Sequence, residues 1–248
     1  MARTFVLSDV HGHLADFRER LLGAGLVDAD DRWVADDAQL WVLGDLVDRG
    51  PDGIGVLRLV RSLLDQAPDH VHLLMGNHES LMLGQKLFPA SRFSDIWTLN
   101  GGHAADQEAL LEDDVAWLRT LPVVAVAGDW LLMHSDTTGY LSWGSSVEEI
   151  NATVAELLAG DDPQTHFDIF AALTDRFDFV GADGPAAARS MTSALGGHRI
   201  VHGHSIIASL VDVPSRLVTE PLVYADGLVV GIDGGRYDGG PLLLVELS

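Results

Sequence analysis

Short apolar runs alternate with amphipathic stretches in the first third of the chain. The runs at residues 4–8, 39–43 and 70–75 are rich in residues that favour buried strands. The stretches between them, near residues 14–22 and 54–64, carry apolar residues at helical spacing. The order strand, helix, strand, helix, strand predicts a parallel sheet that binds ligands beyond the carboxyl ends of its strands.

The middle of the chain is predicted to be helical. Residues 81–121 form this part, with Trp97 and Trp117 expected in the core and a turn at the Asn-Gly-Gly sequence of residues 100–102. Further helices are expected at residues 147–158, 165–177 and 186–195. We interpret the segment of residues 135–197 as a helical cap over the site.

Strand patterns return on both sides of this segment. The runs at residues 123–127 and 130–134 flank Gly128-Asp129, which predicts a hairpin. Four short strands are expected to pair as a second, more antiparallel sheet, at residues 199–201, 222–225, 228–232 and 242–246. No break in composition divides the 248 residues, so a single domain spanning residues 1–248 is predicted.

Polar motifs stand at the ends of the three N-terminal strands. They are Asp9-Val10-His11, Gly44-Asp45-Leu46-Val47-Asp48-Arg49-Gly50 and Gly76-Asn77-His78-Glu79. Oxygen donors from Asp and Asn, mixed with imidazole nitrogen and no thiolate, suit Mn, Fe or Zn better than a Cys-based structural zinc site or a calcium cage. These motifs predict the two-metal catalytic centre of a phosphoesterase.

With His134 and Gly203-His204, these motifs resemble the calcineurin-like metallophosphoesterases, specifically their phosphoprotein phosphatase branch. The resemblance implies a four-layer αββα sandwich with two central mixed sheets. It also implies two divalent or trivalent metal ions, with Mn expected and Fe or Zn compatible. By this resemblance Asp9, His11 and Asp45 would hold one ion, and Asp45, Asn77, His134 and His204 the other, with Asp45 as the bridge.

The resemblance also implies roles for three neighbours of the ligands. A hydroxide that bridges the metals would attack phosphorus directly, without a phosphoenzyme intermediate. Arg49 offers a planar fork for phosphate oxygens. The imidazole of His78 can protonate the leaving alkoxide, and Asp48 would orient it. The alternative interpretation of Asp48-Arg49 is a surface ion pair that closes a turn.

Several residues near these motifs leave alternatives open. His202 would project on the same side as His204 in an extended segment, but His204 matches the ligand of the family. Glu79 begins a predicted helix, where its carboxylate favours the free N–H groups, so structural support is expected from it. Eukaryotic protein phosphatases of this branch carry a further phosphate-contacting arginine, and the candidates for it here are Arg176, Arg189 and Arg199.

Charge and cysteine content narrow the partners. Fifteen Lys and Arg against 37 Asp and Glu give a net charge of −22, which repels nucleic acid and anionic membranes. The absence of cysteine excludes disulfides, a thiol nucleophile and thiolate ligands. The first apolar run is too short for a signal peptide or a membrane span, so a cytoplasmic protein is expected.

The sequence therefore predicts an enzyme, a metal-dependent hydrolase of phosphate monoesters. A Ser/Thr protein phosphatase is the main hypothesis, with a phosphorylated protein or small phosphate ester as substrate. The alternative is a bis(5'-nucleosyl)-tetraphosphatase, because similar motifs serve both activities and residues 100–102 resemble a loop of tetraphosphatase-like proteins. The acidic chain, however, lacks an evident second basic cluster for four phosphates. A non-catalytic scaffold is disfavoured because no proposed ligand is missing.

Overall fold

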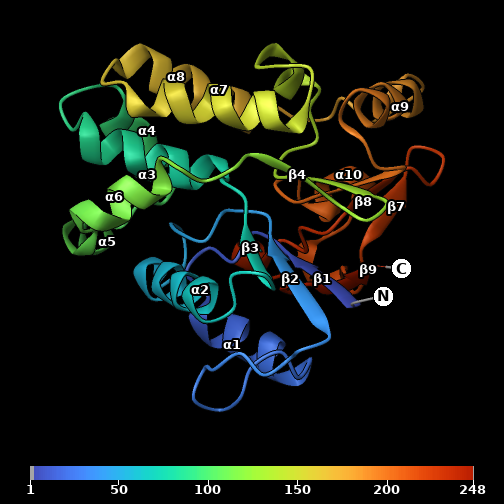
Figure 1. Cartoon of the computed structure of the whole chain (residues 1–248), viewed down its shortest axis with the longest axis horizontal. Helices are drawn as coiled ribbons and strands as arrows, with labels where there is room; N and C mark the ends of the chain where they lie inside the picture. Colours follow the sequence, from blue (N-terminus) through green and yellow to red (C-terminus); the bar gives the residue numbers. More distant parts are fainter. Residues whose placement is uncertain (1–2, 248) are drawn as a thin grey trace.

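The computed structural model describes residues 3–247 and contains two mixed sheets flanked by helices (Figure 1). The first sheet has the strand order β3-β2-β1-β9. Its parallel part is the predicted βαβαβ unit, made of β1 (Arg3–Leu7), α1 (Leu14–Gly23), β2 (Ala38–Val42), α2 (Gly53–Gln66) and β3 (Val71–Leu73). Figure 1 shows α1 and α2 on the outer side of this sheet. The prediction of a parallel N-terminal unit is confirmed.

The second sheet has the order β4-β5-β6-β8-β7. Its strands are β4 (Val124–Ala127), β5 (Trp130–Met133), β6 (Arg199–His202), β7 (Leu222–Tyr224) and β8 (Val229–Gly231). The hairpin of β4 and β5 is antiparallel as predicted, whereas β5, β6 and β8 run parallel to one another. Both sheets are therefore mixed, as the resemblance implied.

One predicted pairing is wrong. The C-terminal strand β9 (Leu244–Leu247) lies beside β1 in the first sheet, antiparallel to it, and not among the other strands of the tail. A β1 strand without this neighbour would leave a row of N–H and C=O groups unpaired at the sheet edge. Pairing with β9 therefore satisfies the edge of β1 with a strand about 240 residues further along the chain. Such a distant pairing is not indicated by the local sequence pattern.

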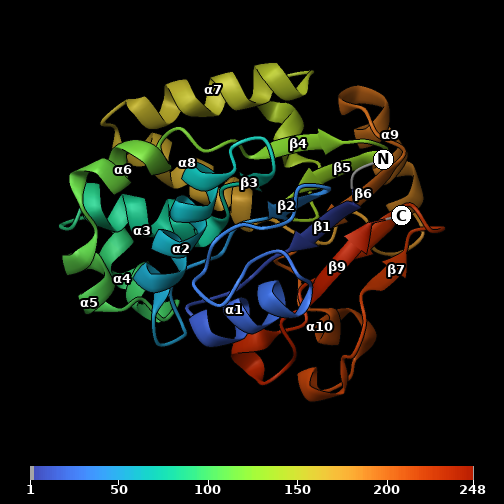
Figure 2. The same ribbon diagram turned by 60° about the horizontal axis from the view of Figure 1, so that its bottom comes forward.

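The middle of the chain forms four helices with a turn at the predicted Asn-Gly-Gly sequence. They are α3 (Asn77–Leu87), α4 (Phe93–Leu99), α5 (Ala104–Ala109) and α6 (Glu112–Leu118). Figures 1 and 2 both show this group at one end of the sheets, away from β7. Trp117 packs against the main core, whereas Trp97 belongs to a smaller cluster with Leu81, Phe93 and Phe170.

The segment between β5 and β6 carries the three predicted helices. They are α7 (Val147–Ala159), α8 (Pro163–Thr174) and α9 (Gly184–Leu195). Helix α8 ends at Thr174, three residues before the predicted end. The following turn is held by Asp136, whose Oδ2 accepts from the Phe177 N–H at 3.1 Å and whose carbonyl accepts from the Asp178 N–H at 3.0 Å. These tertiary bonds replace the next helical turn.

A cluster of buried apolar residues fills the space where the two sheets meet. It includes Val6 of β1, Leu132 of β5, Val201 of β6 and Val230 of β8. The last helix, α10 (Ile207–Val211), is short and lies next to the loop after β6. No helix within residues 3–247 is long and apolar enough to span a membrane.

Candidate metal centre

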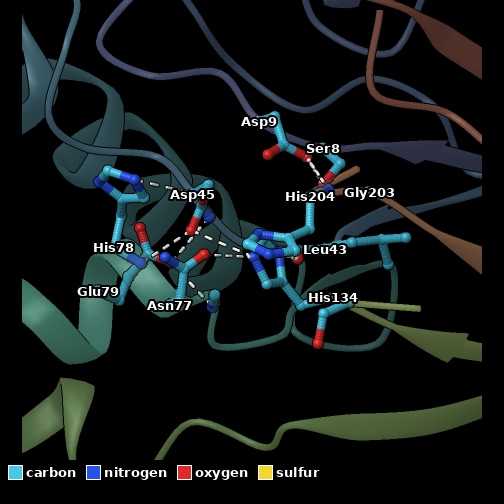
Figure 3. A network of polar contacts seen from close by, with 12 residues as sticks. Ser8, Asp9, Leu43, Asp45, Asn77, His78, Glu79, His134, Gly203 and His204 are labelled. Atoms are coloured by element: carbon cyan, nitrogen blue, oxygen red, sulfur yellow. Dashed lines mark hydrogen bonds and ion pairs between the residues drawn. The ribbon is translucent and has the colours of Figure 1, made fainter. Parts of the chain in front are cut away.

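The predicted metal ligands follow the carboxyl ends of strands from both sheets and meet at one place. They are Asp9 and His11 after β1, Asp45 after β2, Asn77 after β3, His134 after β5 and His204 after β6. All six side chains are buried. Figure 3 shows Asp45 between His78 on one side and His134 with His204 on the other.

Asp45 lies at the centre of this cluster, and its two oxygens face different histidines. Oδ2 is 3.6 Å from Nε2 of His11, and Oδ1 is 3.4 Å from Nε2 of His134. Burial raises the pKa of Asp45 well above its usual range, and the nearby Asp9 raises it further. A buried carboxylate beside a second one is stabilised by cations, so this geometry suits a bridge between two metal ions.

Backbone carbonyls orient three of the histidines. The pairs are His11 Nδ1 with Val47 O at 3.0 Å, His134 Nδ1 with Leu43 O at 2.8 Å and His204 Nε2 with Thr174 O at 3.0 Å. A ring N–H that donates to a carbonyl leaves the other nitrogen as a free donor atom for a metal, which is typical of metal-binding histidines. Burial lowers the pKa of all three, which favours the neutral imidazole that a metal requires.

The donor atoms form two groups that share Asp45. One group is His11, Asp45 and His78, and the other is Asp45, His134 and His204, with the donor atoms of each within 4.8 Å of one another. Asn77 adds an oxygen 3.0 Å from Nε2 of His134. Asp9 lies at the edge of the first group, with Oδ1 3.8 Å from His11 Nε2. This mixture of oxygen and imidazole donors fits two transition-metal ions.

His78 and Asp48 form a buried pair beside the predicted ligands. Nδ1 of His78 lies 2.8 Å from Oδ2 of Asp48. Nε2 of the same ring has no hydrogen-bond partner among residues 3–247 and lies 4.0 Å from Oδ2 of Asp45. Burial raises the pKa of Asp48 to about 7 and lowers the pKa of His78. The unpaired nitrogen is placed to exchange a proton with a group bound at the centre.

Two arginines lie near the site. The guanidinium of Arg49 stacks on the ring of Tyr237, 3.9 Å from its centroid, and its Nη1 is 3.1 Å from Nε2 of His11. Arg176 lies in the turn after α8, and its charge contributes to the lowered pKa of His78 and of His204. Of the three arginines left open by the sequence, Arg176 is the one placed near the cluster; its position depends on the early end of α8.

The backbone of the site adopts a conformation that side chains disfavour. Among residues 3–247, six of the eleven non-glycine residues with positive φ belong to the site: Asp9, His11, Asp45, Asp48, Arg49 and His204. Each such residue costs on the order of 1 to 3 kcal/mol, and such strain concentrates at functional sites. In the sequence, only the glycines next to several of these positions indicate such strain.

Glu79 supports the site from behind. Its carboxylate accepts from the backbone N–H groups of Asp45, Leu46 and Gly76 at 2.8, 2.7 and 2.9 Å. The sequence suggested structural support at the start of α3, and the structure adds the two bonds to the loop after β2. His202 lies outside both donor groups, where its ring contacts the Tyr224 hydroxyl and the Gly203 carbonyl.

Asp233 was not singled out from the sequence. It follows β8 at the same sheet end as His134 and His204, and it is buried. Its Oδ1 accepts from the Gly235 N–H at 2.8 Å, and its Oδ2 has no partner among the described residues. Burial raises the pKa of Asp233 well above the usual range, and the charge of Asp9 raises it further. The position of Asp233 just after a strand could have identified it in the sequence, because the other site residues also follow the carboxyl ends of strands.

Curated proteins similar to this chain include tetraphosphatases and a protein phosphatase. The symmetrical bis(5'-nucleosyl)-tetraphosphatase of Aromatoleum aromaticum is 34% identical over 132 residues, which cover 53% of this chain and 43% of that protein. Shewanella-like protein phosphatase 2 of Arabidopsis thaliana is 24% identical over 243 residues, which cover 95% of this chain and 54% of that protein. The chain thus spans about half the length of these curated relatives.

Solved structures share the fold. A cold-active protein tyrosine phosphatase of a psychrophilic Shewanella species matches with a TM-score of 0.73 at 24% identity, over 100% of this chain and 76% of that one. A putative diadenosine tetraphosphatase matches with a TM-score of 0.51 at 16% identity, over 99% of this chain and 93% of that one. The family model of the calcineurin-like phosphoesterases matches residues 2–207, which include every predicted ligand, and the chain belongs to this family.

Proposed function

We propose that this protein is a metal-dependent phosphatase that hydrolyses phosphate monoesters, with phosphoserine and phosphothreonine in proteins as its substrates. The observation that carries the proposal is the buried His78, which has an unpaired Nε2 beside Asp45 and a carboxylate on its other nitrogen. Two metal ions, when bound, would supply an activated water nucleophile and neutralise charge on the phosphate.

The protein's own residues then have separate tasks. Asp9, His11, Asp45, Asn77, His134 and His204 would hold the two ions. Arg49 binds phosphate oxygens with its planar fork, and Arg176 provides a second positive charge at the site. His78 gives a proton from Nε2 to the leaving oxygen, while Asp48 keeps the ring in place and stabilises its charged form.

The available positive charge favours a single phosphoryl group over a tetraphosphate chain. Arg49 contacts His11, and the charge of Arg176 acts on His78. Arg236 lies nearby, but its guanidinium is paired with the carboxylate of Asp16. A chain of four phosphates would need more unpaired cations along its length. The similarity to a plant protein phosphatase over 95% of this chain supports the same choice.

The second candidate is hydrolysis of dinucleoside tetraphosphates. The relatives with the higher sequence identity, such as that of Aromatoleum aromaticum, carry this activity in their name. Tyr237, 40% exposed beside Arg49, presents an aromatic face on which a nucleobase can stack. The metal centre is common to both activities, so a comparison of substrates is needed to distinguish them.

We propose Mn for both positions, with Fe or Zn as compatible ions, because the donors combine carboxylate, amide and imidazole groups.

We also propose that residues 135–197 form a cap that shapes access to the site. The end of α8 supports this role, since the carbonyl of Thr174 contacts His204. Shortening α7 and α8 should then change substrate preference more than turnover of a small aryl phosphate.

The deciding experiment measures phosphate release by the Mn-loaded protein from a phosphoserine peptide and from diadenosine tetraphosphate, at matched concentrations. A chelator and the Asp45→Asn variant are the controls, since both remove metal. Preference for the peptide supports the protein phosphatase, and preference for the nucleotide supports the second candidate. Absence of turnover on both, with metal bound, would refute the proposed activity.

A further inference from the structure

The indole of Trp97 contacts the acid pair directly. Its Nε1–H donates to Oδ1 of Asp48 at 2.9 Å, while Oδ2 of the same carboxylate lies 2.8 Å from Nδ1 of His78. Trp97 is 7% exposed, and the other two side chains are fully buried. Each oxygen of Asp48 therefore has one donor from the protein, and the two donors together fix the plane of the carboxylate.

The packing around Trp97 leaves the indole little freedom to move. Gly102 lies against the ring, such that a Cβ added there would be 2.0 Å from Cε2 and 2.3 Å from Nε1. The ring also belongs to a buried cluster with Leu81, Phe93 and Phe170, the last of these from helix α8. A ring packed against both a glycine backbone and this cluster has little room to turn its N–H away from Asp48.

The same segment also holds the backbone next to Asp48. The carbonyl of Gly101 accepts from the Arg49 N–H at 2.8 Å. Asp48 and Arg49 both have φ of 65°, and two successive residues in this conformation are unfavourable without outside support. Residues 97–102 thus supply one bond to the side chain of Asp48 and one to the backbone of its neighbour.

We propose that Trp97 is a positioning residue for the leaving-group acid, which it holds in line through Asp48. This inference rests on the proposed phosphatase function, and it adds a residue with no contact to phosphate or metal. Without the indole N–H, Oδ1 would be a buried acceptor with no donor, and the carboxylate could rotate away from His78. Proton delivery to the leaving oxygen would then be slower, whereas metal binding would be unaffected.

The test compares two esters that differ in their need for an acid. Phenyl phosphate has a weakly acidic leaving group that requires protonation, whereas dinitrophenyl phosphate leaves without it. We expect Trp97→Phe to lower kcat for phenyl phosphate about tenfold or more, the effect of leaving one buried acceptor without its donor, and to leave kcat for dinitrophenyl phosphate within about twofold. Gly102→Ala, whose methyl group displaces the indole, should reproduce this pattern.

The matched control is Trp117→Phe, which changes a partly buried tryptophan that packs against the main core. It should keep both rates, and metal content should equal that of the wild type in every variant. In a His78→Ala background, Trp97→Phe should have no further effect on phenyl phosphate, because it acts through His78. This non-additivity separates a positioning role from a general loss of stability.

Three results would overturn the inference while leaving the proposed function intact. The first is a Trp97→Phe variant with wild-type kcat on phenyl phosphate. The second is an equal loss on both esters, and the third is a further loss in the His78→Ala background; either of these would indicate a structural role alone. A wild type that binds metal but hydrolyses neither ester would instead refute the proposed function, and with it this inference.

Discussion

Replacing Glu79 by Gln should damage the site without changing any metal ligand. The wild-type carboxylate accepts three backbone N–H groups: Oε2 accepts from Asp45 and Gly76, and Oε1 accepts from Leu46. An amide has one acceptor oxygen, which can keep the two bonds of Oε2. Its NH₂ group would then face the N–H of Leu46, so one buried donor loses its acceptor and meets another donor.

The size of the effect follows from this count of bonds. A buried polar group left without a partner costs about 1 to 3 kcal/mol. Burial raises the pKa of Glu79 to about 7, whereas the bonds from the three backbone N–H groups favour its charged form. We therefore expect Glu79→Gln to lower the free energy of unfolding by about 2 kcal/mol, which for a domain of this size is a fall in Tm of about 4 to 8 °C.

The assay is thermal unfolding of the metal-free protein by circular dichroism, followed by a titration with Mn. Weaker Mn binding is also expected, because the loop that carries Asp45 loses one of its supports. The control is Glu156→Gln, an exposed position on α7, which should leave Tm and Mn binding unchanged. A Glu79→Gln protein with the Tm of the wild type would refute the argument that the third bond matters.

Four further outcomes are expected. Asp45→Asn and His204→Ala should lose metal and activity together, whereas His78→Ala should keep metal and lose turnover of substrates with poor leaving groups. Metal analysis after gel filtration measures the metal content, and steady-state kinetics measure the activity. Arg176→Lys should raise KM for a phosphopeptide more than it lowers kcat, because lysine keeps the charge but lacks the planar fork; kinetics and inhibition by phosphate measure this. Removing the metals should lower Tm, by the equivalent of about 3 kcal/mol for each of the two ions if that ion was present at a hundred times its Kd; a melt with and without chelator tests it. Burial lowers the pKa of His166 in the folded state, so the neutral ring contributes its full share of the free energy of unfolding at high pH. This share is lost as pH falls through the unfolded pKa of about 6.5, because only the unfolded chain takes up the proton there. In urea unfolding, the free energy of unfolding of His166→Gln should therefore depend less on pH between pH 8 and 5 than that of the wild type.

The N-terminal half of the fold was predictable because its elements are specified locally. Helix α1 begins at Leu14 as predicted, and α2 begins at Gly53, one residue before its predicted start. The strands β1, β2 and β3 each end before a motif of polar residues, and a parallel arrangement follows from the helices between them. Residue types in those motifs indicated the chemistry, because few sites require carboxylates, an amide and imidazoles together.

The parts that could not be predicted depend on contacts between distant segments. The early end of α8 follows from bonds between Asp136 and residues 177–178. The position of β9 follows from the free edge of β1. Trp97 was expected to be a core anchor from its size, and its N–H bond to Asp48 depends on a fold in which α4 lies against the loop after β2. None of these contacts leaves a periodic pattern in the sequence.

The strained backbone explains why the motifs alone do not make a site. Asp45, Asp48 and Arg49 all have positive φ, which an isolated loop of this sequence would avoid. Glu79 holds the N–H of Asp45, and Gly101 holds that of Arg49, from segments more than 30 residues away. Because the strain is offset by these distant bonds, removing a support should relax the loop and move Asp45, the proposed metal ligand, away from Arg49, the proposed phosphate-binding residue. The supports should therefore be as necessary to the chemistry as the residues proposed to bind metal or phosphate, although the supports themselves would contact neither.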